Sequence, residues 1–272
     1  MADNNRNRPI GIFDSGVGGL TVMAEVIRHL PDENIVYFGD VGRCPYGGRS
    51  KETIIQFARQ DIKFLLEHNV KFIIAACNSV SAVALETVKT EFDIEILGVI
   101  SPGAKAAINY TKNGRVGIIG TVATISSNSY AKEIQRLNND IKVFSLACPL
   151  FVPLAEEGYM DKEATKLIAY DYLKSLIDVD IDTLVLGCTH YPLLKNVIAE
   201  VMGNKVKLVD SAEETALALT QVLDNNGLRK EKPEEVIYKL YVSDVPDNFS
   251  DSVHKFLGSR INNITRVDIT RY

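Results

Sequence analysis

Residues 73–79 read Ile73-Ile74-Ala75-Ala76-Cys77-Asn78-Ser79, and residues 184–190 read Leu184-Val185-Leu186-Gly187-Cys188-Thr189-His190. Each stretch is a short apolar run that ends in a cysteine and small polar residues, and a segment of helical periodicity follows it. This pattern predicts a buried strand, a cysteine at its carboxyl end and then a helix. Because a helix N-terminus stabilises a nearby anion, each sulfur is a candidate reactive thiol.

The same alternation of apolar runs and helical segments continues along the chain. It is typical of βα units that build a mainly parallel sheet, so we expect an α/β fold. We expect strands near residues 9–14, 34–39, 70–76, 95–100, 115–120, 141–147, 182–187 and 205–209. We expect helices near residues 18–30, 50–68, 79–91, 102–111, 126–138, 163–178, 192–202 and 211–225.

The end of the chain repeats the alternation after a polar loop at residues 225–233. Two more strands are expected at 236–242 and 265–269, with a helix near 246–257 between them. This tail is too short to bury a core of its own. We therefore expect it to complete the sheet of an earlier part of the chain.

The two halves of the chain resemble each other. The run that contains Asp14 is similar to the run that contains Thr121, 107 residues later, and Cys188 follows Cys77 by 111 residues. Two pairs of motifs at nearly the same offset predict a duplicated α/β half. Parallel α/β sheets bind ligands outside the carboxyl ends of their strands. We therefore expect two similar, pseudo-symmetric α/β domains, with Cys77 and Cys188 facing one cleft between them.

Composition and charge indicate which kind of ligand the protein binds. The chain has 272 residues, of which 46% are hydrophobic and 24% charged, and a net charge of −5 at pH 7, as in an ordinary globular protein. Lysine and arginine are scattered rather than gathered in a basic stripe, so nothing indicates binding to nucleic acid or to a membrane surface. Small molecules are the expected ligands.

The apolar runs and the cysteines indicate the compartment. No apolar run approaches the roughly 20 residues of a membrane-spanning helix. The N-terminal residues also lack the apolar stretch of a signal peptide, so we expect a cytoplasmic protein. The four cysteines, at positions 44, 77, 148 and 188, include no C-x-x-C pair, which argues against a structural zinc site and a disulfide framework. We expect individual thiols and no metal.

Two turns after expected strands have open interpretations. Asp14-Ser15-Gly16-Val17-Gly18-Gly19 resembles a phosphate-binding turn, but it is neither G-x-G-x-x-G nor a Walker A sequence. Its carboxylate would repel a phosphate, whereas it would suit an ammonium group or a neighbouring proton, and a helix N-cap role is equally open. The Gly- and Pro-rich loop 39–48 is most simply a turn. We interpret Cys44 and Cys148, which each precede a proline, as structural.

The chemistry of Cys77 and Cys188 follows from their neighbours. A single buried cysteine is usually a small hydrophobe. Two cysteines at strand ends, with His190 beside one and an acidic residue available to the other, favour proton transfer instead. Without a cofactor motif, this set suits the inversion of a carbon centre, in which one base removes a proton from one face and an acid supplies a proton to the other. One sulfur must then be a thiolate while the other is a thiol.

At these residues the chain resembles the glutamate racemases of the cofactor-independent aspartate/glutamate racemase superfamily. The resemblance rests on five motifs: Phe13-Asp14-Ser15-Gly16-Val17-Gly18-Gly19-Leu20-Thr21, Gly39-Asp40 with Arg43-Cys44-Pro45-Tyr46-Gly47, Ala76-Cys77-Asn78-Ser79, Gly98-Val99-Ile100-Ser101-Pro102-Gly103-Ala104 and Gly187-Cys188-Thr189-His190-Tyr191-Pro192. It implies that L- and D-glutamate are interconverted without a cofactor.

The resemblance also assigns residues to the site. It implies that Cys77 and Cys188 exchange protons with Cα of glutamate from opposite faces, that Asp14 assists Cys77 and that His190 assists Cys188. It implies a further acidic residue at Glu156, although the adjacent Glu157 competes for that assignment. The implied substrate-binding residues are Asp14, Ser15, Asp40, Pro45, Tyr46, Gly47, Asn78, Ser79, Thr121, Thr124, Thr189 and His190.

The resemblance carries expectations about biology and assembly. Family members supply D-glutamate for peptidoglycan and are commonly homodimers. By analogy, one domain combines residues 1–97 with 207–272, and the other is 98–206. Two alternatives stay open: an aspartate or hydantoin racemase, which would use the same thiols, and a non-catalytic amino-acid binding protein, in which the cysteines only pack.

Overall fold

The structure is a computed structural model that describes residues 5–230, 235–245, 249–261 and 263–272. Its strands are β1 (Ile10–Asp14), β2 (Ile35–Gly39), β3 (Phe72–Ala75), β4 (Ile96–Gly98), β5 (Arg115–Gly120), β6 (Lys142–Ala147), β7 (Thr183–Gly187), β8 (Lys207–Asp210), β9 (Tyr238–Val242) and β10 (Ile264–Arg266). Its α-helices are α2 (Leu20–His29), α3 (Lys51–Glu67), α4 (Asn78–Val83), α5 (Leu85–Glu91), α6 (Ile100–Tyr110), α7 (Val122–Ser126), α8 (Ser129–Leu137), α9 (Phe151–Glu156), α10 (Glu163–Asp178), α11 (Lys195–Met202), α12 (Ser211–Asn225) and α13 (Phe249–Leu257). Short 3₁₀ turns are η1 (Val41–Arg43), η2 (Tyr46–Gly48), η3 (Tyr191–Leu194), η4 (Gly258–Arg260) and η5 (Ile269–Arg271).

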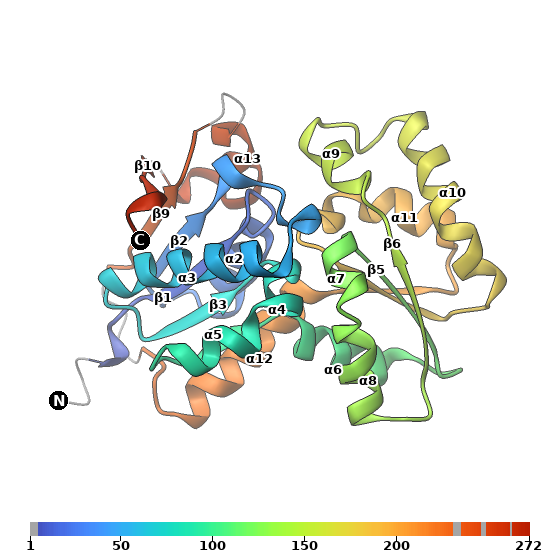
Figure 1. Ribbon diagram of the computed structural model, residues 1–272, viewed down its shortest axis with the longest axis horizontal. Coiled ribbons are helices and arrows are strands. Elements are labelled where there is room, and N and C mark those ends of the chain that lie inside the picture. The colour runs from blue at the N-terminus through green and yellow to red at the C-terminus, as the bar shows by residue number, and fades with distance from the viewer. Residues whose placement is uncertain (1–4, 231–234, 246–248, 262) are drawn as a thin grey trace.

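The strands form two sheets that lie side by side (Figure 1). The larger sheet has the order β10-β9-β2-β1-β3-β4, and the smaller has the order β6-β5-β7-β8. Every pairing among the described strands is parallel. The prediction of an α/β fold with two mainly parallel sheets is therefore confirmed. The expected strands in the tail are also present, because β9 pairs with β2 and β10 pairs with β9.

The strand order reveals the predicted duplication. The order β2-β1-β3-β4 in one sheet matches β6-β5-β7-β8 in the other, so β1 corresponds to β5 and β3 to β7. Phe13 lies opposite Ala75, and Ile119 lies opposite Leu186, two residues before Cys77 and Cys188 respectively. If the two cysteines are equivalent, the counterpart of Thr121 is therefore the residue after Asp14, one position away from the sequence-based pairing.

Helices cover both faces of each sheet (Figure 1). In the larger sheet, α2, α12 and α13 pack on one face and α3, α4 and α5 on the other. In the smaller sheet, α9, α10 and α11 pack on one face and α6 and α8 on the other. Because both faces are covered, the central strands β1 and β7 are buried at every residue and have the continuous apolar sequence typical of parallel sheets.

Several helices differ from the predicted ones. The predicted helix 79–91 is interrupted at Ala84, which separates α4 from α5. The predicted helix 126–138 is preceded by α7 and begins only after Asn128, whose backbone has a left-handed φ of 58°. No helix is predicted at α9, which contains Pro153 in its first turn, where proline is tolerated. Part of the predicted helix 246–257 lies outside the described residues.

The proposed division of the chain into 1–97 plus 207–272 and 98–206 stays a prediction. Sheet pairing bears on the second boundary of this division, because β8 pairs with β7 and so belongs to the smaller sheet. Asp210 both ends β8 and caps α12 by accepting a hydrogen bond from the Ala212 amide at 2.9 Å. A division by sheets therefore falls after Asp210 rather than before residue 207.

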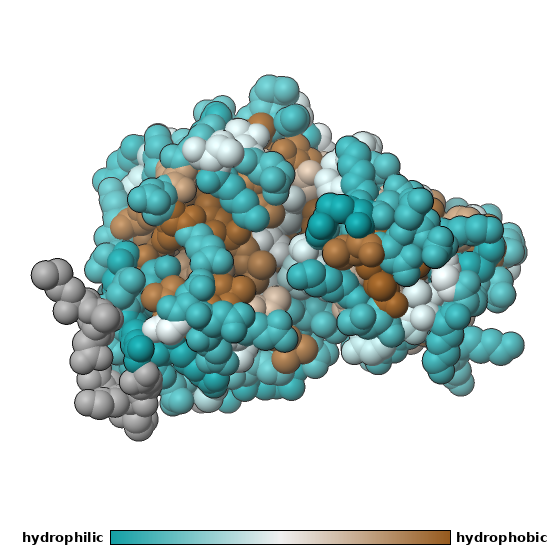
Figure 2. Space-filling view, turned by 90° about the horizontal axis from the view of Figure 1, so that it is seen from below, coloured by the Kyte–Doolittle hydropathy of each residue, from teal (hydrophilic) through white to brown (hydrophobic). Residues whose placement is uncertain are grey.

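The hydropathy of the surface and of the helices bears on contact with membranes. Figure 2 shows one face of the molecule as mainly hydrophilic, with smaller apolar areas on both halves. Among the described residues, no helix combines the length and the apolar composition needed to span a bilayer.

Candidate active site

The carboxyl ends of the two sheets meet and are joined by hydrogen bonds. Ser79, at the start of α4 in the larger half, has its Oγ 3.0 Å from Thr121 Oγ1, which follows β5 in the smaller half. Thr189, after β7, donates through Oγ1 to Asp14 Oδ1 at the end of β1, at 3.4 Å. These four predicted residues therefore lie where the two halves of the molecule meet.

Cys77 lies at the end of β3, directly before α4, and is only 4% exposed. Its Sγ–H donates to Ser15 Oγ at 3.5 Å. The Asp14 carboxylate is fixed nearby, since its Oδ2 accepts hydrogen bonds from the amides of Gly16 and Gly19 at 3.0 and 2.9 Å. Burial, reinforced by the charge of Asp14, raises the pKa of the Cys77 thiol to about 12. Cys77 is therefore a thiol at neutral pH.

Cys188 lies at the end of β7, next to an imidazole and a carboxylate. His190 Nδ1 is 3.9 Å from Cys188 Sγ, and His190 Nε2 is 3.0 Å from Glu156 Oε1. The same carboxylate oxygen accepts from Cys44 Sγ at 3.5 Å. Glu156, the last residue of α9, is thus the acid that contacts His190, although both Glu156 and the neighbouring Glu157 are exposed residues.

These contacts favour the charged imidazolium form of His190. Burial alone would lower the pKa of His190, but its hydrogen bonds to Cys188 and Glu156 outweigh burial and raise that pKa to about 10. Partial burial alone would raise the pKa of Glu156, but the hydrogen bond from His190 outweighs it and lowers that pKa. A proton on His190 therefore faces the sulfur of Cys188 at neutral pH.

Buried polar side chains lie at the junction of the two halves. Thr121 Oγ1 lies 3.1 Å from Thr124 Oγ1 and also accepts from the Thr124 amide at 3.3 Å. Asn78 Oδ1 accepts from the Tyr130 hydroxyl at 2.7 Å. Among the residues that the structure describes, buried Asn78 Nδ2 finds no acceptor. A buried donor without a partner is costly, so Asn78 suits a carboxylate ligand.

Asp40 and Tyr46 hold the loop between β2 and α3. Asp40 Oδ2 accepts from Arg43 Nε at 2.5 Å and from the Tyr46 hydroxyl. Arg43 also donates to buried Asp61 at 3.2 Å, and burial raises the pKa of Asp61 well above its usual range. The peptide bond before Pro45 is cis. These contacts position the loop, and direct substrate contact by Asp40, Pro45 and Tyr46 stays a prediction.

Gly47 brings the same loop against the smaller half. A Cβ at this position would lie 2.5 Å from Thr121 Cβ, whereas a Cβ at Gly48 would meet no described atom within 4 Å. We expect Gly47→Ala to push the halves apart and lower kcat/KM by about 10- to 100-fold, since overpacking costs about 1–3 kcal/mol. Gly48→Ala is the matched control and should resemble the unsubstituted protein in steady-state assays. Equal rates for the two variants would contradict this packing argument.

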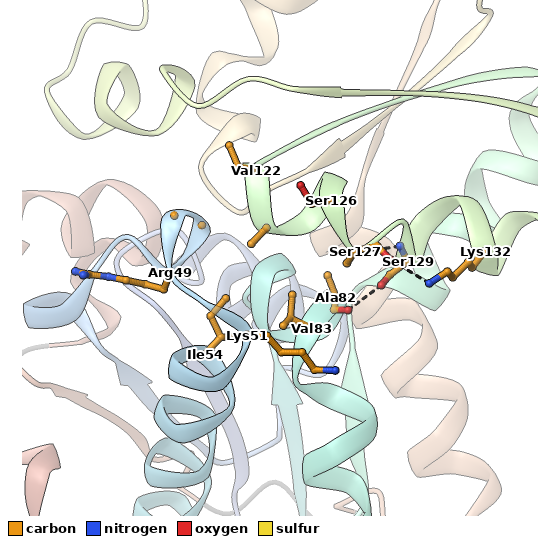
Figure 3. A pocket seen from close by; sticks show the side chains of 13 residues that line it. Arg49, Lys51, Ile54, Ala82, Val83, Val122, Ser126, Ser127, Ser129 and Lys132 are labelled. Carbon is orange, nitrogen blue, oxygen red and sulfur yellow. Dashed lines mark hydrogen bonds between the residues drawn. The ribbon is translucent and has the colours of Figure 1, made fainter.

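A separate cavity of about 490 Å³ borders the contact between Gly47 and the smaller half (Figure 3). It is lined by Gly47, Gly48, Arg49, Lys51, Ile54, Ala82, Val83, Val122, Ala123, Ser126, Ser127, Ser129 and Lys132. Ser129 Oγ donates to the Ala82 carbonyl at 2.7 Å, which adds a hydrogen bond between α8 and α4. Neither Cys77 nor Cys188 lines this cavity, so it is distinct from the site of the two thiols.

Two residues of the site were not identified from the sequence. Cys44 is interpreted there as structural, but its sulfur contacts Glu156, 112 positions away. Tyr130 belongs to no motif, yet its hydroxyl orients Asn78. Such contacts depend on how helices pack, and no spacing in the sequence indicates them.

Among the residues that the structure describes, two groups of side chains have the ligand types and spacing to hold a metal ion. They are Cys44, Glu156 and His190, and Glu25, His29 and Glu213. In the second group, Arg28 already forms ion pairs with Glu25 and Glu213 at 2.6 and 2.9 Å. The arginine neutralises the acids there, which leaves the first group as the better candidate.

Comparison with known proteins agrees with the geometry. A sequence model described as Asp/Glu/Hydantoin racemase matches residues 14–219. A glutamate racemase from Geobacter metallireducens is 48% identical over 262 residues, covering 96% of this chain and 97% of the relative.

Two solved structures are similar along almost their whole length. Glutamate racemase isoform RacE1 from Bacillus anthracis has a TM-score of 0.93 and 40% identity, covering 97% of this chain and 98% of that chain. Glutamate racemase from Francisella tularensis in complex with D-glutamate has a TM-score of 0.92 and 40% identity, covering 98% of this chain and 100% of that chain. This chain belongs to the Asp/Glu/hydantoin racemase family and, within it, to the glutamate racemases.

Proposed function

We propose that Cys77 and Cys188 exchange protons with Cα of glutamate from opposite faces of the cleft. The observation that carries this proposal is their equivalence, since Cys77 follows β3 and Cys188 follows β7, which are corresponding strands of two matching sheets. Hydrogen bonds such as Ser79 to Thr121 bring those strand ends to one site. Binding alone does not require a thiol from each half, which disfavours a non-catalytic binding protein.

The environments of the two sulfurs favour unequal starting states. His190 as an imidazolium is placed to stabilise the thiolate of Cys188 when that sulfur acts as the base, and Cys77 begins as a thiol. In one direction, Cys188 removes the Cα proton and becomes a thiol. Cys77 then gives its proton to the opposite face of the carbanion and becomes a thiolate. In the other direction the roles exchange, and Asp14 is placed to assist proton transfer at Cys77.

Removing a proton from a weak carbon acid such as Cα of glutamate requires hydrogen-bond donors that stabilise the resulting negative charge. The Asn78 amide and the hydroxyls of Ser79, Thr121 and Thr189 are buried at the joined strand ends. Fixed donors in a site that excludes water stabilise negative charge as it develops on the substrate. We infer that these groups hold the substrate carboxylates and stabilise the carbanion.

Incubation of L-glutamate with the reduced protein in D₂O tests the reaction. We expect optical rotation to fall while deuterium replaces the Cα proton in the NMR spectrum, without added pyridoxal phosphate. L-aspartate in a parallel reaction tests the alternative substrate and should react far more slowly. Unchanged rotation with both amino acids would favour a binding protein, and faster loss with aspartate would favour an aspartate racemase.

We also propose the cellular setting that the family suggests. The product D-glutamate would serve peptidoglycan synthesis, and the enzyme would work in the cytoplasm as a homodimer. The four free cysteines, Cys44, Cys77, Cys148 and Cys188, suit a reducing compartment.

A further inference from the structure

We propose that Cys44, Glu156 and His190 form an inhibitory site for a thiophilic divalent cation, of which Zn²⁺ is the best match. One donor atom from each residue lies within 4.8 Å of the other two. Sulfur, carboxylate oxygen and imidazole nitrogen are ligands that zinc accepts together, whereas Mg²⁺ prefers oxygen ligands alone.

The distances fit a tetrahedral ion. Zinc bound at its usual ligand distances separates neighbouring ligand atoms by about 3.3–3.6 Å. Cys44 Sγ lies 3.5 Å from Glu156 Oε1, and His190 Nε2 lies 3.0 Å from the same oxygen. The three donor atoms all lie within 4.8 Å of one another, so side-chain shifts would close them around an ion, and three protein ligands leave a fourth position for water.

Charge and access also fit. Binding requires the Cys44 thiol and the His190 imidazolium each to release a proton to solvent. The Cys44 thiolate and the Glu156 carboxylate would then neutralise a divalent cation, while His190 binds it as a neutral imidazole. His190 is buried, but the Glu156 side chain is 36% exposed and Cys44 is partly exposed, so an ion reaches the site from solvent.

The loop that carries Cys44 is already held in place. Asp40 and Asp61 both accept hydrogen bonds from Arg43, the residue before the cysteine. A Cβ at Gly16 would lie 2.9 Å from Cys44 Sγ, so glycine there allows the sulfur to approach Glu156. Preorganised ligands lower the cost of ordering a site when the metal binds.

The expected consequence of binding is inhibition. The ion would take Nε2 of His190 away from Glu156 and would tie the loop after β2, in the larger half, to α9 and the end of β7 in the smaller half. A cleft joined in this way cannot open to exchange substrate. This consequence rests on the proposed role of His190, whereas the metal site itself does not.

Two measurements on the full-length protein, reduced with a phosphine that does not compete for zinc, test the proposal. The first is racemisation of glutamate at buffered free Zn²⁺ concentrations, with Mg²⁺ in parallel. We expect inhibition by Zn²⁺ alone, reversed by EDTA. The second is the visible spectrum with Co²⁺, where tetrahedral thiolate coordination produces intense bands whether or not the enzyme turns over.

Cys44→Ser is the diagnostic variant, and Cys148→Ser, at a buried free thiol of the smaller half, is its control. Cys44→Ser should weaken both Zn²⁺ inhibition and Co²⁺ binding by at least about tenfold, measured relative to its own metal-free activity. Cys148→Ser should weaken neither. Equal inhibition of Cys44→Ser and the unsubstituted protein would overturn the site and assign the ion to other thiols. Cobalt bands that require Cys44 without any zinc inhibition would retain the site and overturn its inhibitory role.

Discussion

Replacing Cys77 or Cys188 with alanine is expected to lower the racemisation of glutamate by at least about 10³-fold. Inversion requires removal of a proton from one face of Cα and its replacement on the other. Each alanine variant keeps only one sulfur and so serves only one face. Because Cys77 and Cys188 follow equivalent strands in different sheets, neither can substitute for the other.

Deuterium exchange distinguishes a variant that has lost proton transfer at one face of Cα from a variant whose whole site is inactive. In D₂O, a variant with one thiol should still exchange the Cα proton of the enantiomer whose proton faces that sulfur, and return deuterium to the same face. The two variants should therefore exchange opposite enantiomers of glutamate without inverting either. NMR of the Cα signal measures exchange, and circular dichroism of glutamate measures inversion.

Cys148→Ala is the matched control, since Cys148 is also a buried, free thiol at the end of a strand. It should retain racemisation, and thermal unfolding should show that all three variants are folded. Unimpaired racemisation in Cys77→Ala or in Cys188→Ala would refute the two-thiol mechanism. Exchange of the same enantiomer by both variants would show that the thiols do not serve opposite faces.

Much of the fold could be predicted because burial of a parallel sheet on both faces produces a recognisable sequence pattern. The residues of β1 and β7 are covered on both faces, so their sequences are continuous apolar runs. The break between α7 and α8 depends on the left-handed backbone of Asn128, and α9 contains a proline. Local sequence does not distinguish such breaks from loops, because packing of the neighbouring helices decides them.

The candidate site residues could be predicted where a reactive side chain lies at or just after the carboxyl end of a strand. Asp14, Cys77 and Cys188 stand at such ends, and strand order brings those ends together. Glu156 and Cys44 meet through α9 and a loop held by Arg43, and neither contact has a spacing that a sequence displays. The sequence therefore predicts the residues proposed to transfer protons, whereas Cys44 is interpreted from it as structural alone.

Replacing His190 with asparagine is expected to lower kcat by about 10²- to 10⁴-fold, the usual contribution of a positioned acid or base. His190 has its pKa raised to about 10, so as an imidazolium it stabilises negative charge on Cys188 throughout the neutral range. Asparagine keeps a polar side chain of similar reach but has no charge. Steady-state racemisation in both directions measures the loss, and activity close to that of the unsubstituted protein would exclude His190 from the mechanism.

The raised pKa of His190 also predicts how stability and activity change with pH. A pKa raised from 6.5 to about 10 in the folded state means that protonated His190 stabilises the fold fully below pH 6.5 and loses that contribution as pH rises through about 10. The unsubstituted enzyme should lose activity over the same alkaline range, while His190→Asn should lack that alkaline limb. Glu156→Gln removes one of the groups that raise this pKa but keeps the imidazole, so its alkaline limb should move to lower pH. Among the described residues, His190 contacts both the sulfur of Cys188 and the carboxylate of Glu156. If the alkaline loss of activity kept its pH in Glu156→Gln and persisted in His190→Asn, the group that titrates there would not be His190.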